Sequence, residues 1–217
     1  MTELLTDVTG AAAGVAGYRR QAQQNFRVRA GAVVIASGGC AFMSKALGCD
    51  VDTGDGALLA AEAGAELAGM EFSNAYGIAP AGTSVTKGAF YRYSTFYRED
   101  GSVLEGAGGH KPYEKNYLRR GDVLTDSLAM LDDIWSTVRS SLGGVGEDAV
   151  RTRQAAAMTA HARWMYNAAL ARTETRGMAK RLDFPAEDPA QHHRLTTGGL
   201  DEVWVRREAH LRTVAVA

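Results

Sequence analysis

The sequence predicts an α/β fold with a helical C-terminal part, and two patterns lead to this expectation. The run AVVIA at residues 32–36 is short, apolar and rich in β-branched residues, and Gly38 and Gly39 close it. Such a run is typical of a buried strand in a parallel sheet that is covered on both faces. Two long stretches of helical periodicity follow at residues 122–142 and 147–172. The chain is therefore expected to join pieces of sheet to a mainly helical second half.

The first 117 residues contain three further kinds of segment. Residues 4–17 carry short Val-containing runs between glycines, which favours a ribbon of strands and turns. Residues 56–67, GALLAAEAGAEL, are rich in strong helix formers, and the polar residues 53–55 precede them, so a helix is expected there. Residues 70–117 scatter Gly, Ser, Thr and Tyr among short apolar runs, so irregular and extended structure is expected.

The second half predicts two amphipathic helices separated by the glycine-rich residues 143–146. Both segments repeat apolar residues at steps of three and four, which is the spacing of one helical face. In the first segment these positions are Leu124, Leu128, Leu131, Trp135, Val138 and Leu142, and in the second they are Ala157, Ala160, Trp164 and Ala168. Residues 199–216 alternate in part between apolar and polar, which favours a short strand or hairpin at the surface.

Charge and cysteine content exclude several classes of function. Lys and Arg together number 24 against 25 Asp and Glu, so no basic field favours nucleic acid as a partner. Cys40 and Cys49 are too few for a disulfide framework, and no set of residues has the spacing of metal ligands. The sequence shows no transmembrane run and no signal region, which predicts a soluble, cytoplasmic protein.

Two short motifs could contact a ligand. The strand that ends in Ser37, Gly38 and Gly39 has small residues that let a ligand approach backbone amides, although a tight turn alone explains the same pattern. The sequence TGDG at residues 53–56 opens the first predicted helix. Asp55 could accept hydrogen bonds from ligand hydroxyl groups, or it could only cap the free amides of that helix.

Four blocks in this order resemble the succinate dehydrogenase/fumarate reductase flavoprotein family. They are AGAVVIASGG at residues 30–39, TGDGALLAAEAGAELAGMEF at 53–72, NAALARTETRG at 167–177 and DFP at 183–185. The resemblance implies an FAD-dependent oxidoreductase in which Ser37, Gly38, Gly39 and Asp55 contact FAD. It also places Arg172, Glu174, Arg176 and Gly177 in a C-terminal helical domain, with Thr175 where relatives have serine.

The resemblance also implies two residues near the substrate. Tyr76 stands where family dicarboxylate enzymes have a substrate histidine, and its phenol could donate a hydrogen bond or simply pack at the surface. Arg120 precedes the helix at residue 122, as does the proton-donating arginine of the family, although an exposed arginine beside a helix start explains the same pattern. Because a guanidinium donates a proton only where it is fixed and dehydrated, its environment decides this role.

Several family segments have no counterpart in this sequence. The G-x-G-x-x-G turn that holds the FAD pyrophosphate is missing, since Gly10, Gly14 and Gly17 have a different spacing. The chain also passes from residue 142 to residue 155 without a second FAD-binding stretch. We therefore expect a partial FAD-binding domain with Rossmann-like sheet pieces at residues 1–70, a partial substrate or cap region at 71–118 and a helical C-terminal region at 119–217.

This incompleteness leaves two functional hypotheses. In the first, the chain takes part in hydride transfer between a small-molecule substrate and the flavin N5 atom, and it is inactive alone. In the second, it is a non-catalytic fragment, or a subunit that depends on a complementary chain or on other copies of itself. His192 and His193 lack a third metal ligand nearby in the sequence, so a metal site is not expected there. Cys40 has no neighbouring base in the sequence, so a packing role is expected rather than a reactive thiol.

Overall fold

The computed structural model describes residues 1–44, 49–72, 95, 97–103 and 118–208. Its elements, in chain order, are β1 (Glu3–Thr6), β2 (Ala12–Arg19), β3 (Gln24–Arg29), α1 (Asp55–Glu62), β4 (Leu67–Ala68), the 3-10 turn η1 (Met70–Phe72), β5 (Leu118–Arg119), α3 (Gly121–Ser141), α4 (Glu147–Ala171), β6 (Lys180–Arg181), the 3-10 turn η3 (Pro189–Gln191), β7 (Leu195–Gly198) and β8 (Trp204–Arg207). The mixture of helices and small sheets agrees with the predicted α/β class in its coarse form.

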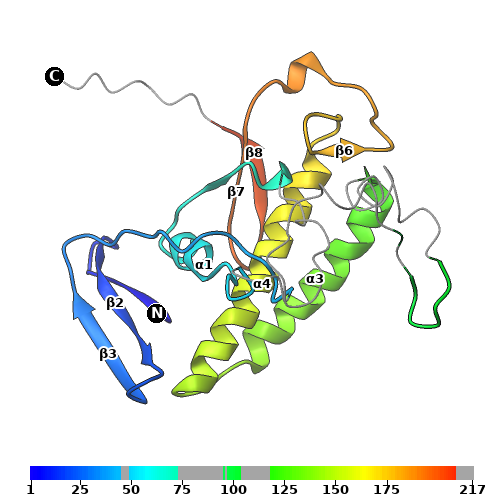
Figure 1. Ribbon diagram of the computed structural model, residues 1–217. Helices are drawn as coiled ribbons and strands as arrows, with labels where there is room; N and C mark the ends of the chain where they lie inside the picture. The colour runs from blue at the N-terminus through cyan, green and yellow to red at the C-terminus, as the bar shows by residue number, and fades with distance from the viewer. Residues whose placement is uncertain (45–48, 73–94, 96, 104–117, 209–217) are drawn as a thin grey trace.

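The two long helices form the centre of the molecule. Figure 1 shows α3 and α4 side by side and antiparallel, with α1 against α4 and the β1–β3 sheet beyond α1. Both helices begin and end within one residue of the predicted positions. The four expected apolar positions on α4 are all buried, as are Leu124, Leu128 and Trp135 on α3. Leu131 and Val138 are half-buried, and Leu142, which follows α3, is exposed. Local periodicity was therefore sufficient to predict this half.

A hydrophobic core joins α1 to these helices. Leu58 of α1 and Met70 of η1 are buried with Trp135 of α3 and Trp164 of α4. Trp164 also donates a hydrogen bond from Nε1 to the backbone oxygen of Gly199, at 2.8 Å. Burying large aromatic and aliphatic side chains contributes about 1.5–3 kcal/mol each, so this cluster stabilises the docking of α1 on α4.

Helix α1 is shorter than the sequence predicted. It ends at Glu62 because Gly64 adopts a left-handed conformation with φ of 86°. The amide of Ala65 donates to the oxygen of Ala60 and the amide of Gly64 donates to the oxygen of Ala61, which is the Schellman pattern of helix termination. The chain then continues into β4, which pairs with β7.

Three small sheets make up the strand content of the described residues. β1, β2 and β3 form an antiparallel sheet in chain order, as expected for the N-terminal ribbon. β4, β7 and β8 form a second antiparallel sheet. β8 lies within residues 199–216, where a surface strand or hairpin was expected, but its partner β7 precedes that range and is buried. The two-residue strands β5 and β6 are the parallel pair.

The buried parallel strand predicted at residues 32–36 is not formed. These residues have no regular structure, and the side chains of Val34 and Ile35 are 90% and 38% exposed. A parallel strand needs neighbouring strands on its edges and covering helices on its faces, and the described part of the chain supplies neither at this segment. The prediction of a buried parallel strand at residues 32–36 was therefore wrong. The strands of the described residues do not include the expected Rossmann-like sheet pieces.

Candidate functional site

The segment that ends in Ser37–Gly39 lies against the TGDG turn. Cys40 and Thr53 form an antiparallel bridge, and the amide of Ala41 donates to the oxygen of Asp52 at 2.6 Å. A Cβ added to Gly56 would lie 1.9 Å from Oγ of Ser37, so only glycine permits this contact. The structure thus places residues 37–39 against the turn that carries Asp55.

The glycine pair leaves its backbone accessible. Gly38 has φ of 72°, and a Cβ added to it would lie 3.4 Å from Oδ2 of Asp52. A Cβ added to Gly39 would meet nothing within 4 Å. Among the described residues, no backbone–backbone hydrogen bond engages residues 31–39. Amides in such an open, glycine-rich turn can donate to an incoming ligand.

Asp55 is the first residue of α1, and its side chain is held in place. The hydroxyl of Thr53, which is fully buried, donates a hydrogen bond to Oδ2 of Asp55. The N-cap residue is Gly54, in a left-handed conformation, and no side chain caps the helix. Asp55 therefore does not cap the helix, although its negative charge is favoured at a helix N-terminus. Its other oxygen and remaining lone pairs can accept further hydrogen bonds.

His161 of α4 lies beside this turn, and sequence reasoning missed it. Its Nδ1 atom is buried and has no hydrogen-bond partner among the described residues. A Cβ added to Gly54 would lie 3.3 Å from this atom. Burial lowers the pKa of His161. The sequence spacing does indicate that His161 is buried. It follows Ala157 by four residues and precedes Trp164 by three, so it lies on the predicted apolar face of the helix.

Cys40 occupies the same junction. Its Cβ and Sγ would lie 3.2 and 3.6 Å from a Cβ on Gly54. Burial, with a smaller contribution from the charges of Asp55 and Asp52, raises the pKa of the Cys40 thiol to about 11. The thiol therefore stays protonated at neutral pH and acts as a small packing group.

Two adjacent arginines precede α3, and they differ in environment. Arg120, the predicted proton donor, is exposed and forms an ion pair with Asp122, with Nη2 and Oδ2 2.5 Å apart. Arg119 is partly buried and donates from Nη1 to the backbone oxygen of Glu71 at 2.6 Å. Burial lowers the pKa of Arg119. The fixed and partly dehydrated guanidinium that proton donation requires is therefore found at Arg119, and the role of Arg120 stays a prediction.

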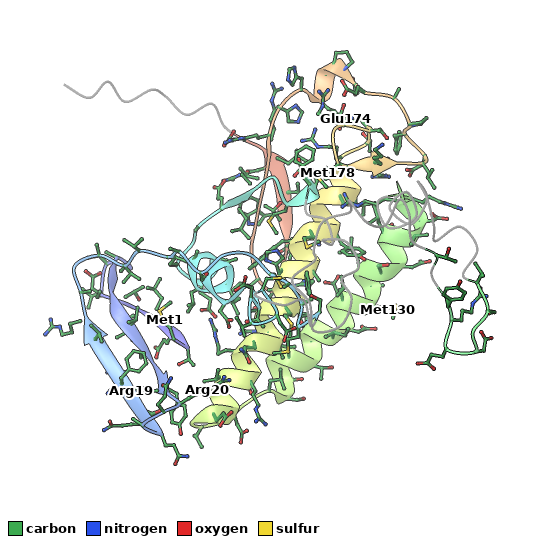
Figure 2. The ribbon with its side chains drawn as sticks, in the orientation of Figure 1. Met1, Arg19, Arg20, Met130, Glu174 and Met178 are labelled. Atoms are coloured by element: carbon green, nitrogen blue, oxygen red, sulfur yellow. The ribbon has the colours of Figure 1, made fainter. Side chains whose placement is uncertain are left out.

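Glu71 belongs to a buried ionic network with three residues of the NAALARTETRG block. Arg172 contacts Glu71 and Glu174, with shortest N–O distances of 2.6 and 2.9 Å, and all three side chains are at most 1% exposed. Arg176 extends the network to Glu174 at 2.8 Å. Figure 2 shows Glu174 in the loop that follows α4. Because Arg172 also donates to the backbone oxygens of Gln191 and His193, its guanidinium is saturated and holds the fold rather than a ligand.

Tyr76, the predicted substrate contact, lies outside the described residues. Within the described ranges, no group of three or more His, Cys, Asp and Glu side chains could hold a metal ion. In the same ranges, no helix is long and apolar enough to cross a membrane.

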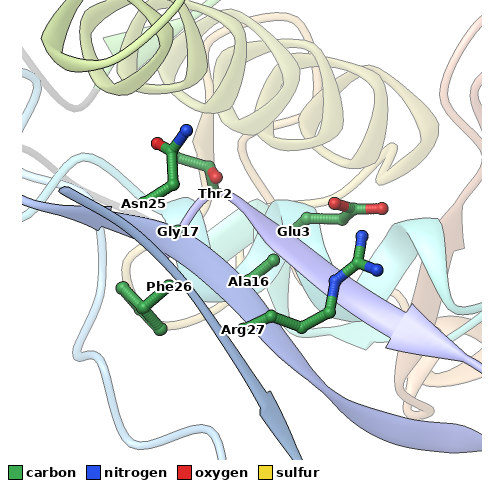
Figure 3. A pocket seen from close by; sticks show the side chains of 7 residues that line it. All are labelled: Thr2, Glu3, Ala16, Gly17, Asn25, Phe26 and Arg27. Carbon is green, nitrogen blue, oxygen red and sulfur yellow. The ribbon is translucent and has the colours of Figure 1, made fainter.

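A shallow hollow lies elsewhere, on the N-terminal sheet. Figure 3 shows Glu3 and Arg27 on either side of Ala16, and the register of β1, β2 and β3 places these three residues in one row. Its lining residues are Thr2, Glu3, Ala16, Gly17, Asn25, Phe26 and Arg27. None of the predicted site residues belongs to it.

The matches to known proteins differ in extent. Residues 117–213 match the family described as "Fumarate reductase flavoprotein C-term". L-aspartate oxidase from Rhodospirillum rubrum is 43% identical over 79 residues, which are 36% of this chain and 24% of that protein. The solved structure of Mycobacterium smegmatis Sdh1 in complex with UQ1 aligns with a TM-score of 0.38 at 17% identity, over 45% of this chain and 18% of that one.

The family match and the L-aspartate oxidase match bear on the resemblance seen in the sequence. The family match includes the two long helices, the β7–β8 hairpin, and Arg172, Glu174 and Arg176 of the buried ionic network, but not Glu71. The matched segment of L-aspartate oxidase is about a quarter of that protein's length. The C-terminal part of the chain thus matches the fumarate reductase flavoprotein family, and the L-aspartate oxidase match supports the same resemblance.

Proposed function

We propose that the chain contributes one edge of an FAD site to an oxidoreductase of the succinate dehydrogenase/fumarate reductase type. The observation that carries the proposal is the contact between the Ser37–Gly39 segment and the TGDG turn. Cys40 bridges to Thr53, and the Ser37 hydroxyl packs on Gly56. Two motifs that are 14 residues or more apart in sequence thereby form one surface with open amides and a carboxylate.

The residues at this surface fit part of an FAD molecule. The open backbone at Gly39 can donate hydrogen bonds to a ribose or phosphate oxygen, and Asp55 can accept from a ribose hydroxyl. The pyrophosphate would need further amides, because the G-x-G-x-x-G turn is missing from the sequence. Weak binding by the chain alone follows from this partial fit.

FAD, when bound, supplies the redox chemistry by accepting or giving a hydride at N5. The chain's own groups would hold the cofactor and the substrate. The backbone of residues 37–39 and the Asp55 carboxylate orient the cofactor, while Tyr76 donates a hydrogen bond to the substrate. Arg120 is the proton donor that the family resemblance proposes, and Arg119 is the neighbouring guanidinium whose burial suits that role better.

FAD retention tests this proposal with a matched pair of glycine variants. The chain is mixed with FAD, free cofactor is removed, and the visible spectrum of the retained flavin is recorded. A Cβ at Gly39 and a Cβ at Gly31 both meet nothing within 4 Å, so Gly39→Val and Gly31→Val leave the fold intact to the same degree. We expect Gly39→Val to weaken FAD binding about tenfold, or 1.4 kcal/mol, and Gly31→Val to have no effect. Equal retention by both variants would contradict the proposed location.

A second candidate function is that of a subunit that completes its site with a complementary chain. The observation that favours it is the exposed apolar run at residues 32–36, whose backbone has no partner in the described part of the chain. Exposed runs of this kind mark sites of strand addition or protein contact. A chain that carries a G-x-G-x-x-G strand and helix is the expected partner.

Sedimentation of the mixture tests this second candidate. The chain is combined with such a complementary chain, and the mass of the complex and its FAD content are measured together. A complex that retains FAD, when neither chain does so alone, supports the partner-dependent function. Val34→Asp should abolish the complex, since it places a charge at the exposed run. If the single chain retained FAD without assembly, the partner-dependent function would be excluded.

A further inference from the structure

The junction of residues 40–44 and 49–59 with α4 contains a histidine that has no chemical task in the proposed function. His161 projects from α4 toward the TGDG turn, and its ring packs edge-on against Phe42 and Trp164, at centroid distances of 5.9 and 6.3 Å. Gly54 approaches the ring so closely that an added Cβ would lie 3.3 Å from Nδ1. His161 is therefore enclosed between two segments that are far apart in sequence.

The buried ring nitrogen makes this enclosure sensitive to protonation. Nδ1 has no hydrogen-bond partner within the described residues. In the neutral ring Nδ1 can be an unprotonated acceptor, so the unpaired nitrogen carries no buried charge. In the imidazolium ion both nitrogens carry protons, and a buried N–H without an acceptor adds to the cost of burying the charge.

We propose that His161 is a proton-sensitive joint, which releases residues 40–44 and 49–59 from α4 when its imidazole becomes charged. The released segment includes the Cys40–Thr53 bridge, Asp55 and the buried residues Leu58 and Leu59 of α1. Release would therefore open the surface formed by residues 37–39 and the TGDG turn. The inference concerns the chain without cofactor, so it does not depend on FAD binding.

The charged groups around the joint do not compensate for protonation of His161. The 40–44 segment presents the Cys40 thiol, which stays neutral; Asp55 belongs to the TGDG turn, and Asp52 directly precedes it. Asp55 accepts from the buried Thr53 hydroxyl. On the elements beside it, Glu62 of α1 pairs with Arg153 of α4.

Arg163 of α4, although close in sequence, is directed away from the joint to Asp132 and to the oxygens of Leu200 and Asp201. Burial lowers the pKa of His161 below its ordinary value of 6.5, so the two nearby aspartates do not outweigh burial. The docked state then binds fewer protons than the released state. Its stability is complete above pH 6.5 and is lost as the pH falls below 6.5.

Hydrogen exchange on the cofactor-free chain tests the joint. Protection factors for residues 40–44 and 49–59 are compared at pH 7.5 and pH 5.5, after correction for the intrinsic exchange rate. One group whose pKa is lowered changes the opening equilibrium by at most about tenfold per pH unit. We expect opening of this segment to increase several-fold, up to about tenfold, while α3 keeps its protection.

Three variants separate the joint from general acid effects. His161→Gln and His161→Phe cannot be protonated in this range and should abolish the pH dependence, whichever of the two docks better. His192→Gln is the matched control, because His192 is exposed, and it should keep the dependence of the unchanged chain. An equal increase in opening in His161→Gln and in the unchanged chain would overturn the proposal. A pKa of His161 at or above 6.5, measured by NMR titration, would also overturn it.

Discussion

Arg172 donates two hydrogen bonds to the same carboxylate oxygen of Glu71, from Nε at 3.0 Å and from Nη2 at 2.6 Å. The two residues are 101 positions apart, and both side chains are buried. Glu71 lies in η1, and Arg172 follows the last residue of α4. This pair fixes the end of the TGDG-to-MEF block against the C-terminal helices.

Replacing Arg172 by Met should destabilise the chain strongly. Methionine has a similar length but no charge, so Glu71 would be left buried without its main partner and Glu174 would lose one of its two arginines. Breaking a buried pair in this way costs about 3–5 kcal/mol of the free energy of unfolding, which urea titration measures. Arg151→Met is the control, because Arg151 forms an exposed pair with Glu147 that contributes less than about 0.5 kcal/mol. A loss below about 1 kcal/mol for Arg172→Met would contradict the importance of the pair.

The same network predicts a specific acid transition. Burial alone would raise the pKa of Glu174, but hydrogen bonds from Arg176, from the amide of Asp188 and from Arg172 outweigh it and hold the pKa at about 2. The ionised carboxylate therefore stabilises the fold above the ordinary pKa of 4.5, and this stability is lost as the pH falls from 4.5 toward 2. The loss by pH 2 is at most about 3 kcal/mol.

Glu174→Gln tests the acid transition. The variant should be less stable at pH 7, and its free energy of unfolding should depend less on pH between 4.5 and 2 than that of the unchanged chain. Urea titrations at a series of pH values measure this difference. Parallel pH profiles for the two proteins would show that Glu174 is not the group responsible.

Replacing Arg181 even by lysine should destabilise the chain. Its Nη1 atom donates to the backbone oxygens of Ala169, Leu170 and Arg172, which lie at the end of α4, and its fork binds Asp183. Lysine keeps the charge but cannot satisfy carbonyls and carboxylate together. Arg181→Lys should therefore cost about 1–3 kcal/mol in urea unfolding. Arg194→Lys, at an exposed pair with Glu208, should be neutral, and equal stability of both variants would refute this account of the helix end.

Two glycines with similar backbone angles should differ in their response to alanine. Gly54 and Gly64 have φ of 79° and 86°, so alanine strains both by about 1–2 kcal/mol. A Cβ at Gly64 meets nothing within 4 Å, whereas one at Gly54 crowds Cys40 and His161. We expect Gly54→Ala to lose at least about 1 kcal/mol more than Gly64→Ala in thermal or urea unfolding. Equal losses would mean that the TGDG turn is not packed closely on α4.

The helical half could be predicted from sequence because its pattern is local. Leu124, Leu128 and Trp135 repeat at helical spacing, and the glycines at residues 143–146 mark the boundary between the helices. The strand expected at residues 32–36 failed for the opposite reason. Its β-branched residues favour a strand, but a strand forms only where neighbouring strands pair with it. The sequence of the run does not show whether such neighbours are present.

The candidate site was predictable only in part. The TGDG turn and the Ser37–Gly39 segment were recognised as motifs. Their contact, however, requires that residue 56 has no side chain where the Ser37 hydroxyl packs. His161 was missed because one histidine on an apolar helix face gives no information about what covers it. The pairing of Glu71 with Arg172 spans too much sequence to appear in any periodicity.

Amide chemical shifts during an FAD titration test the central claim most directly. The account predicts that FAD selectively shifts the amides of Gly38, Gly39, Gly54 and Asp55, and that the hollow between Glu3 and Arg27 is unaffected. The affinity is expected to be weak, since the pyrophosphate lacks its glycine-rich turn. Shifts confined to the N-terminal sheet, or none at millimolar FAD in a folded sample, would contradict the proposed FAD edge.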